Sequence, residues 1–322
     1  RRWWAQKNNQ KGFVIMKTES KLEKVLASGA LAVTSEVGPP RGAIPEKVRQ
    51  KANLIKDHVD AINVTDNQTA MVRMSSWAAG VIIKQMGLDP ILQMVTRDRN
   101  RLAMQSDIIG AYSLGINTMM CLSGDHAKFG DHPMAKGVFD LDSIQLVQTV
   151  QKMRDKGKFQ GGADIDTPPK MFIGAAANPF ADPFELRVMR LAKKVKAGAD
   201  FIQTQCIFNL DKFEKYMEMV CDRGLDKKVH LLAGITPMKS AGMARYMKNK
   251  VPGMDVPDEI IKRMAGVSKE KQPEEGIKIA IESIERLKQV KGVHGFHIMA
   301  IEWEEKVPQI VEKAGLFPRP AL

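Results

Sequence analysis

The sequence alternates short apolar, β-forming segments with amphipathic helical segments, and this alternation occurs eight times. The apolar segments read as strands buried on both faces, as in a parallel sheet that helices cover. Strand–helix units repeated at roughly 30 residues are typical of one closed α/β barrel, a single (β/α)₈ TIM barrel. The expected strands are Leu31–Val37, Ala61–Thr65, Ile91–Thr96, Thr118–Ser123, Met171–Ala177, Phe201–Phe208, Val229–Thr236 and Phe296–Ile301.

The helical segments between these strands mostly end at a glycine, a common signal for the end of a helix. Two further helical segments before the last strand predict a helical insertion there. An open doubly wound sheet is the alternative fold, but it needs a GxGxxG motif after the first strand, and none occurs. The expected helices are Pro45–His58, Met71–Met86, Arg99–Leu114, Leu141–Lys156, Phe184–Ala197, Asp211–Arg223, Lys239–Lys250, Glu304–Ala314 and the inserted Asp258–Met264 and Pro273–Val290.

The expected domain organisation is an N-terminal extension with a first helix over residues 1–28 and a catalytic barrel over residues 29–322. The helix is expected at Lys17–Ser28. The first residues, Arg1-Arg2-Trp3-Trp4, lack the long apolar core of a secretory signal. They are interpreted either as an upstream extension or mis-assigned start, or as a tail whose tryptophan pair docks on a neighbouring protein.

The amino-acid composition limits which classes of protein this chain can belong to. The three cysteines form no CxxC pair and no disulfide framework, which favours a reduced, cytoplasmic setting and predicts no metal site. No apolar run reaches the length of a membrane span. The net charge of +12 is read either as a basic solvated surface or as attraction for anionic ligands or an acidic partner. Nucleic acid is not expected, because the basic residues are scattered over many helices.

In such a barrel the residues at the C-terminal ends of the strands face one shared mouth, where barrel enzymes keep their chemistry. The first strand ends with Glu36, and the fourth ends with Ser123-Gly124-Asp125. The sixth strand carries Gln203-Thr204-Gln205, whose buried amides need hydrogen-bond partners that a ligand can supply. Two carboxylates at one mouth, Glu36 and Asp125, suggest that one is held protonated by burial and the other stays ionised.

Taken together, these strand ends resemble the methylenetetrahydrofolate reductase family. The resemblance covers residues from about Leu31 to Pro320 and lies in several motifs in the same order, each at a strand end. These are Thr34-Ser35-Glu36 with Pro39-Pro40-Arg41, Val64-Thr65, Leu122-Ser123-Gly124-Asp125, Thr204-Gln205 and Gly234-Ile235-Thr236-Pro237.

The resemblance implies a flavin-dependent barrel that reduces 5,10-methylenetetrahydrofolate to 5-methyltetrahydrofolate. Glu36 matches the family's general acid, which protonates N10 as the imidazolidine ring opens, after which reduced flavin N5 delivers hydride to the methylene carbon. A leaving amine needs a proton, so this acid must be neutral at working pH.

Other site residues are carried over from the same resemblance. Asp125 matches an aspartate near flavin N1 and the pterin, so it is expected to be catalytic and to contact both cofactor and substrate. Gln205 matches a pterin-binding glutamine. The cofactor-binding residues are expected to be Thr65, Gln93, Ser123, Gly124, Asp125, Phe139, Asn178 and Lys194, with Lys194 near the flavin phosphates.

The sequence departs from better-known members at Ser123, Asn178, Asp182, Ala241 and Trp303. FAD is expected from the family resemblance, and these departures leave FMN as the alternative. The chain resembles a branch found in anaerobes, which implies a hetero-oligomer with a zinc and iron–sulfur subunit that transfers electrons; a homo-oligomer is the alternative. Two other functions stay open: a pterin-binding methyltransferase-type barrel, and a structural barrel subunit without its flavin.

Overall fold

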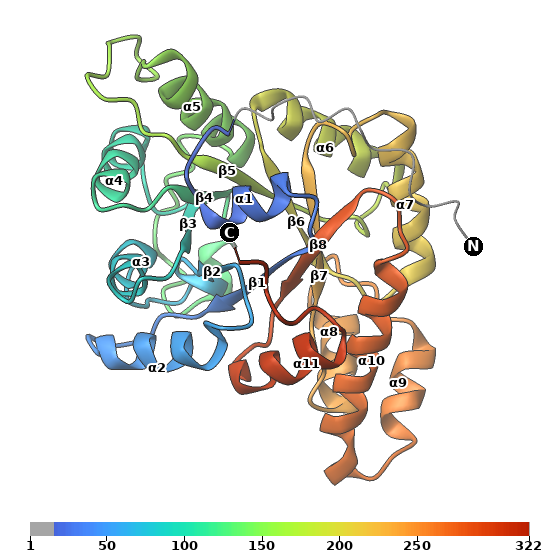
Figure 1. Ribbon diagram of the computed structural model, residues 1–322. Helices are drawn as coiled ribbons and strands as arrows, with labels where there is room; N and C mark the ends of the chain where they lie inside the picture. Colours follow the sequence, from blue (N-terminus) through green and yellow to red (C-terminus); the bar gives the residue numbers. More distant parts are fainter. Residues whose placement is uncertain (1–15, 322) are drawn as a thin grey trace.

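The computed structural model describes residues 16–321 and forms a closed barrel of eight parallel strands in the order β1 to β8 (Figure 1). β1 pairs with β2 on one side and with β8 on the other, which closes the barrel. The predicted TIM barrel is confirmed. The strands are β1 Ala32–Val37, β2 Ala61–Val64, β3 Pro90–Val95, β4 Thr118–Leu122, β5 Phe172–Ala177, β6 Phe201–Cys206, β7 His230–Ile235 and β8 Val293–Ile298.

Eight helices surround the barrel and pack apolar faces against the outside of the strands. In the part of the chain that the structure describes, no helix is both long enough and apolar enough to cross a membrane. The helices of this outer ring are α2 Pro45–Ile55, α3 Ser76–Gln85, α4 Arg101–Ser113, α5 Ser143–Lys156, α6 Glu185–Ala197, α7 Leu210–Asp222, α10 Gln272–Leu287 and α11 Val307–Lys313.

Several element boundaries differ from those predicted, and three of them have a clear local reason. α3 starts at Ser76 rather than Met71, because Ser75 caps it and Ala70 adopts a positive φ of 57°. Helix α1 covers Lys21–Ala27 and begins four residues late, because Ser20 caps it by accepting a hydrogen bond from the Glu23 amide. β8 begins three residues before Phe296, across a His-Gly pair that interrupts the apolar run.

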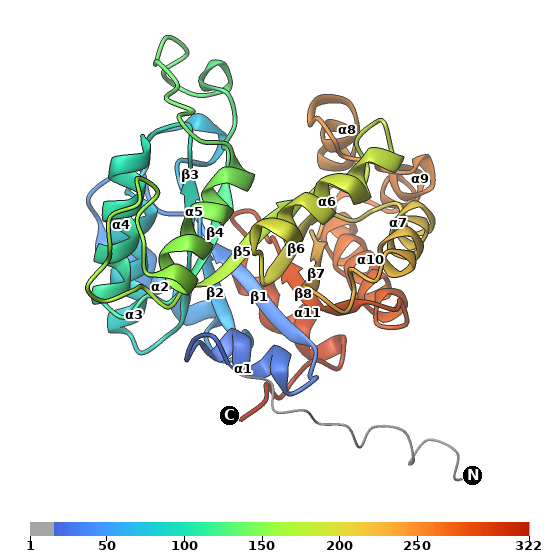
Figure 2. The ribbon, with the colours of Figure 1, turned by 90° about the horizontal axis from the view of Figure 1, so that it is seen from above.

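The N-terminal end of the barrel is closed by α1. In Figure 1 this helix lies in front of the barrel opening, and in Figure 2 it lies below the strands. Its buried Leu22, Val25 and Leu26 pack in one cluster with inward-facing residues of the strands, including Phe172 and Phe201. The phenyl rings of Phe172 and Phe201 stack with centroids 5.2 Å apart. Within residues 16–321, this apolar layer closes one end of the barrel and leaves the opposite end open. The predicted tryptophan tail lies outside the described residues.

The predicted insertion before the last strand is confirmed, and its helices have different roles. Helices α8 (Ala241–Lys250) and α9 (Asp258–Ala265) share a separate apolar cluster that includes Met247 and Met264, and lie beside one another in Figure 2. α10 instead buries Ile284 and Leu287 in the main core, so it is the helix that covers the last strands. α8 and α9 therefore form the additional layer, whereas the predicted insertion consisted of Asp258–Met264 and Pro273–Val290, which correspond to α9 and α10.

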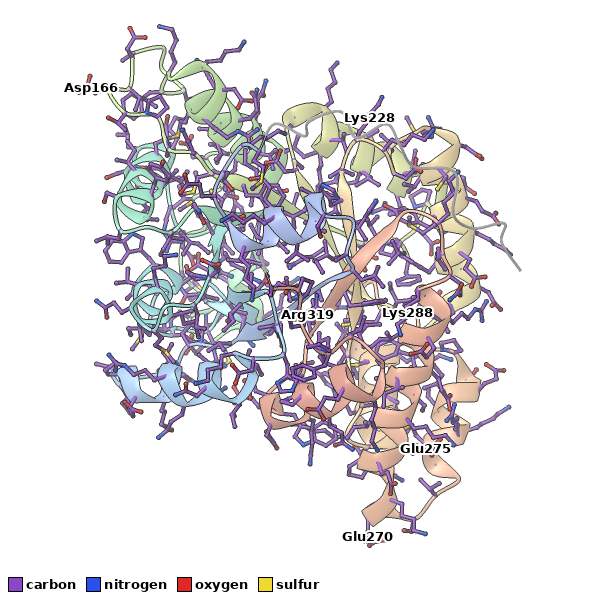
Figure 3. All side chains as sticks on the ribbon, in the orientation of Figure 1. Asp166, Lys228, Glu270, Glu275, Lys288 and Arg319 are labelled. Atoms are coloured by element: carbon purple, nitrogen blue, oxygen red, sulfur yellow. The ribbon has the colours of Figure 1, made fainter. Side chains whose placement is uncertain are left out.

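Buried ion pairs join the strands near their N-terminal ends. Asp60 accepts a hydrogen bond from the Val33 amide of β1 and forms an ion pair with Arg319 at 2.6 Å. This pair holds the C-terminal segment against the N-terminal end of β1 (Figure 3). Asp200 accepts a hydrogen bond from the Ile173 amide and pairs with Arg154 at 2.5 Å. A buried pair of this kind satisfies strand amides and charge together.

Candidate active site

A cavity of about 410 Å³ opens at the C-terminal mouth of the barrel. Residues of six strand ends and one face of α6 line it, and its volume falls within the range of small-molecule sites. The lining includes five of the predicted site residues, which come from four strands or the residues just after them and from α6. These are Glu36, Gln93, Asn178, Lys194 and Gln205.

Glu36 lines this cavity, and its surroundings favour the uncharged form of its carboxyl group. Burial raises its pKa to about 7, and the nearby carboxylate of Glu304 adds to the increase by like-charge repulsion. Lys51 opposes that increase, but it is held by Glu302 at 2.6 Å and Glu304 at 3.0 Å. The carboxyl of Glu36 is therefore half-protonated near neutral pH, as a proton donor requires.

A chain of buried polar side chains crosses the barrel interior beneath the cavity. Asn63 and Gln203 exchange two amide hydrogen bonds of 2.7 and 3.0 Å, and Gln203 Nε2 also donates to Thr34 Oγ1 at 3.1 Å. Thr34 Oγ1 lies 3.0 Å from Nδ1 of His297, whose Nε2 lies 4.0 Å from Glu36 Oε2. Thr34 and Glu36 share a face of β1 because alternate residues of a strand point the same way.

This chain leaves His297 uncharged and its outer nitrogen directed at the acid. Burial lowers the pKa of His297 to about 3. Gln203 donates to Thr34, whose hydroxyl has two acceptors within reach, Nδ1 of His297 at 3.0 Å and the Phe296 carbonyl at 3.4 Å. When Thr34 donates to Nδ1, the ring proton of the neutral imidazole lies on Nε2, on the side of Glu36. A neutral imidazole beside the acid does not stabilise its ionised form as a cation would.

Two amide side chains in the cavity are available to a ligand. Gln93 and Gln205 line the cavity, and neither side chain makes a hydrogen bond to the residues described. Asn178, by contrast, accepts a hydrogen bond from the Phe180 amide at 2.9 Å. An amide can donate and accept at once, so free glutamines suit a ligand with mixed polar edges.

α6 brings positive charge to the same cavity. Lys194 donates to the Ala176 carbonyl at 2.5 Å, and Arg187 and Arg190 line the wall beside it. Burial, together with the positive charge of the neighbouring Arg190, lowers the pKa of Lys194 to about 8. A bound anion would relieve both effects, because it favours the charged form of lysine.

The other five predicted residues are not among those that line the cavity. Thr65 donates to Gln68 at 2.6 Å, and the side chain of Asp125 is exposed on the loop after β4. Ser123 and Gly124 belong to the same loop, and Gly124 adopts a positive φ of 84°. The Phe139 amide donates a hydrogen bond to the Thr96 carbonyl. The structure therefore puts these residues at the rim next to β2, β3 and β4, and their predicted roles stay predictions.

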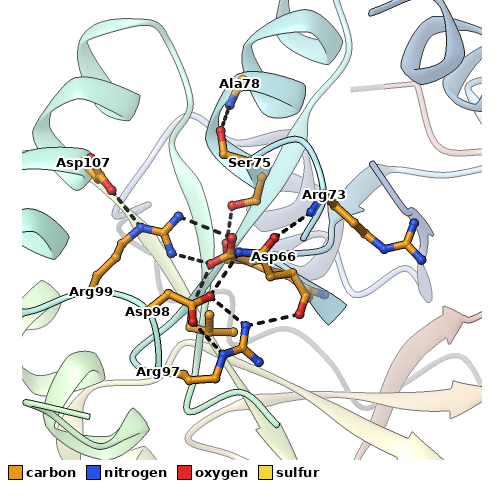
Figure 4. A network of polar contacts seen from close by, with 12 residues as sticks. Asp66, Arg73, Ser75, Ala78, Arg97, Asp98, Arg99 and Asp107 are labelled. Carbon is orange, nitrogen blue, oxygen red and sulfur yellow. Dashed lines mark hydrogen bonds and ion pairs between the residues drawn. The ribbon is translucent and has the colours of Figure 1, made fainter. Parts of the chain in front are cut away.

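Arginine–aspartate pairs organise this rim (Figure 4). Arg97 is fixed by Asp98 at 2.7 Å and donates to the Asp125 carbonyl at 2.9 Å. Arg99 bridges Asp66 at 2.7 Å and Asp107 at 3.0 Å. The side chains thus hold the loop after β4 to the end of β3 and leave the guanidinium charges neutralised.

Sequence reasoning missed several residues of this site. His297 lies inside an apolar run, and the signal that could have found it is its spacing of two from Met299, which puts both side chains on one face of a strand. Arg187 and Arg190 read as solvent-facing residues of an amphipathic helix. Glu304 starts the last helical segment and gave no signal of its proximity to Glu36.

Comparison with known proteins identifies relatives for most of the chain. The family model described as methylenetetrahydrofolate reductase matches residues 21–315. Methylenetetrahydrofolate reductase 2 of Schizosaccharomyces pombe is 28% identical over 229 residues, which cover 65% of this chain and 33% of that protein. The 5,10-methylenetetrahydrofolate reductase of Salmonella typhimurium is 21% identical over 300 residues, covering 90% and 93%. The chain spans about a third of the length of the eukaryotic relatives it matches.

A solved structure supports the fold independently. A protein from Clostridium thermocellum, described as binding two copies of 5-methyl-5,6,7,8-tetrahydrofolic acid, superposes with a TM-score of 0.63 at 13% identity. The match covers 92% of this chain and 100% of that one. At this identity the likeness shows a common barrel fold.

Proposed function

The chain belongs to the methylenetetrahydrofolate reductase family, and from this premise we propose that it reduces 5,10-methylenetetrahydrofolate to 5-methyltetrahydrofolate with a flavin as cofactor. The observation that carries the proposal is Glu36, whose pKa is raised to about 7 at the wall of the mouth cavity. The reaction needs a proton donor for the amine that leaves as the folate ring opens. A buried carboxyl with this pKa is suited to that task.

In the proposed mechanism Glu36 donates its proton to N10 of the folate. His297 and Thr34 hold the polar floor beneath it without adding a positive charge, so the acid keeps its proton until the amine accepts it. Gln205 is proposed to bind the pterin edge with its free amide. Asp125 is proposed to complete the site from the rim, as the family resemblance implies.

The residues of the cavity fit a flavin. Cations on α6 suit its phosphates, and the free amide of Gln93 suits the polar edge of its ring system. Thr65, Ser123, Gly124, Phe139 and Asn178 are proposed to hold it from the neighbouring strand ends. When bound, a reduced flavin supplies the hydride. FAD is proposed from the family, with FMN as the alternative.

We also propose that electrons reach this chain from a partner subunit. Support comes from the resemblance to the anaerobe branch and from the changed residues Ala241 and Trp303 on the electron-donor side. The net charge of +12 suits an acidic partner. The proposed setting is the cytoplasm.

Purification of the native protein tests the cofactor and the partner together. We expect flavin absorption bands, a flavin that mass spectrometry identifies as FAD or FMN, and a co-purifying subunit with iron–sulfur absorption. A colourless protein that takes up no added flavin would overturn the flavin-dependent function. A coloured protein that purifies without a second subunit and is rapidly reduced by NADH would overturn only the partner proposal.

A further inference from the structure

Two consecutive residues in the segment after β8 adopt a left-handed backbone conformation. Ile301 has a φ of 48° and Glu302 a φ of 56°. Residues other than glycine rarely adopt positive φ, and a β-branched residue such as isoleucine does so at an energetic cost. A turn of this kind persists only where the contacts around it hold it in place.

Lys239 holds the backbone of this turn from the segment between β7 and α8. Its Nζ donates to the carbonyl oxygens of Ile301 at 3.0 Å and Glu302 at 2.9 Å. The same Nζ lies 5.7 Å from the ring centre of Trp303, within the range of a cation–π contact. One ammonium group therefore contacts three consecutive residues of the segment.

Lys51 holds the side chains that flank the turn, from α2 on the other side. Its Nζ lies 2.6 Å from Glu302 and 3.0 Å from Glu304. The side chain of Glu302 is 58% exposed and that of Glu304 only 8%. A buried carboxylate requires a counter-charge, so the contact with Lys51 keeps Glu304 charged and in place.

The charges that act on Glu36 come from these same groups. Burial is the largest cause of its raised pKa, and the carboxylate of Glu304 is the next. Lys51 lowers this pKa and Glu302 raises it, whereas Lys239 is not among the charges that shift it. Any effect of Lys239 on Glu36 must therefore pass through the position of the turn.

The other titratable groups near Glu36 carry no charge near neutral pH. His297 on β8 lies 4.0 Å away, and burial lowers its pKa to about 3. Burial raises the pKa of the Cys206 thiol on β6 to about 12. The segment after β8 and α2 thus supply the charges that set the protonation of Glu36.

We propose that Lys239 and Lys51 are positioning residues, which hold the left-handed turn at Ile301 and Glu302 and thereby keep the carboxylate of Glu304 beside Glu36. The proposal rests on the proposed role of Glu36 as the proton donor. It assigns to two lysines outside the cavity lining the task of keeping that donor protonated. Glu304 acts on Glu36 by its charge, and the lysines act through Glu304.

Titration of the Glu36 carboxyl in the ligand-free chain tests the proposal. Glutamate carboxyl carbons are labelled with ¹³C for NMR, and the Glu36 signal is assigned by its loss in Glu36→Gln. We expect a midpoint near pH 7 in the unmodified chain. Lys239→Met should place it at a pH lower by about 0.5 or more, because Glu304 is no longer held beside Glu36. The control Lys250→Met removes an exposed lysine at the end of α8 and should leave the midpoint unchanged.

A double variant tests whether Lys239 acts through Glu304. Glu304→Gln alone should lower the midpoint, and adding Lys239→Met should lower it by less than about 0.2 more, because the charge to be positioned is gone. Lys51 is left unchanged, because its own charge acts on Glu36. Single-turnover folate reduction by Lys239→Met should show its fall with pH displaced in the same direction.

An unchanged midpoint in Lys239→Met would overturn the inference. A raised midpoint would also overturn it, because a lost cation that acted directly on a carboxyl would raise its pKa. Equal effects of Lys239→Met with and without Glu304→Gln would exclude the route through Glu304. The NMR titrations need neither flavin nor folate, so failure of the proposed function would show separately, as folate reduction retained in Glu36→Gln.

Discussion

Nε2 of His297 lies 4.0 Å from Oε2 of Glu36, and this pair is not a salt bridge near neutral pH. Burial lowers the pKa of the imidazole to about 3 and raises that of the carboxyl to about 7. At pH 6 both groups are therefore uncharged. The histidine orients the polar floor of the site, and the proton available for chemistry stays on Glu36.

The pH dependence of folate reduction should report Glu36 and respond to Glu304. The protonated acid predominates below its pKa of about 7, so the rate should be highest below that pH and fall as pH rises through it. Glu304→Gln removes a negative charge that raises this pKa and frees Lys51 to lower it. The fall should begin at lower pH in single-turnover measurements across pH 5–9, a range around that pKa. The exposed neighbour provides the control: Glu305→Gln should leave the profile unchanged. An identical profile for Glu304→Gln would contradict the coupling.

The hydrogen-bonded amides of Asn63 and Gln203 beneath the cavity should contribute to the stability of the fold. Gln203→Leu leaves the buried Asn63 amide without its partner, which should lower the free energy of unfolding by about 1–3 kcal/mol. Changing both residues to leucine removes the unsatisfied group and should recover part of that loss. Urea denaturation of the two variants measures the difference. A double variant that loses the sum of both single losses would show that the pair does not act as a unit.

The buried ion pair between Arg154 and Asp200 should be a major determinant of stability. Asp200→Asn leaves the guanidinium without a buried counter-charge, and we expect a loss of about 3–5 kcal/mol in the free energy of unfolding. Asp155→Asn removes the more exposed carboxylate that contacts the same arginine and should cost less than about 1 kcal/mol. Thermal and urea unfolding check both values. Equal losses would contradict the importance of burial.

Electron supply gives a kinetic prediction. The isolated chain loaded with flavin should be reduced by NADH slowly or not at all, because a partner subunit is proposed to deliver the electrons. Stopped-flow absorbance under anaerobic conditions follows the flavin directly. Dithionite should reduce the same sample fully, which controls for a damaged cofactor site. Rapid bleaching by NADH alone would refute the need for a partner.

Much of the fold follows from local patterns, because each strand of a parallel barrel is an apolar run that a helix separates from the next. The pattern fails where a local exception intervenes. Gly295 and His294 disguise the start of β8, and Ala70, with its positive φ, delays α3. Such exceptions depend on tertiary contacts that no short stretch of sequence encodes.

The site was predictable in parts for a similar reason. Glu36 and Gln205 could be found because each ends or nearly ends a recognisable strand. His297 could not, because a histidine in an apolar run acquires a role only when the adjacent strand, β1, supplies Thr34 as its neighbour. Arg187 and Arg190 resemble ordinary surface residues until α6 is placed along the cavity. Sequence patterns therefore predict which residues end the strands, whereas the packing of the folded chain determines which of these residues meet in the site.

The central claim is that Glu36 donates the proton that opens the folate ring, and Glu36→Gln tests it most directly through the two half-reactions. The substitution keeps size and hydrogen bonding but removes the proton donor. Flavin reduction by dithionite or by the native electron donor should proceed at the unmodified rate, whereas oxidation of the reduced flavin by 5,10-methylenetetrahydrofolate should fall by roughly 100-fold or more. Equal loss of both half-reactions, or retention of folate reduction, would contradict the claim.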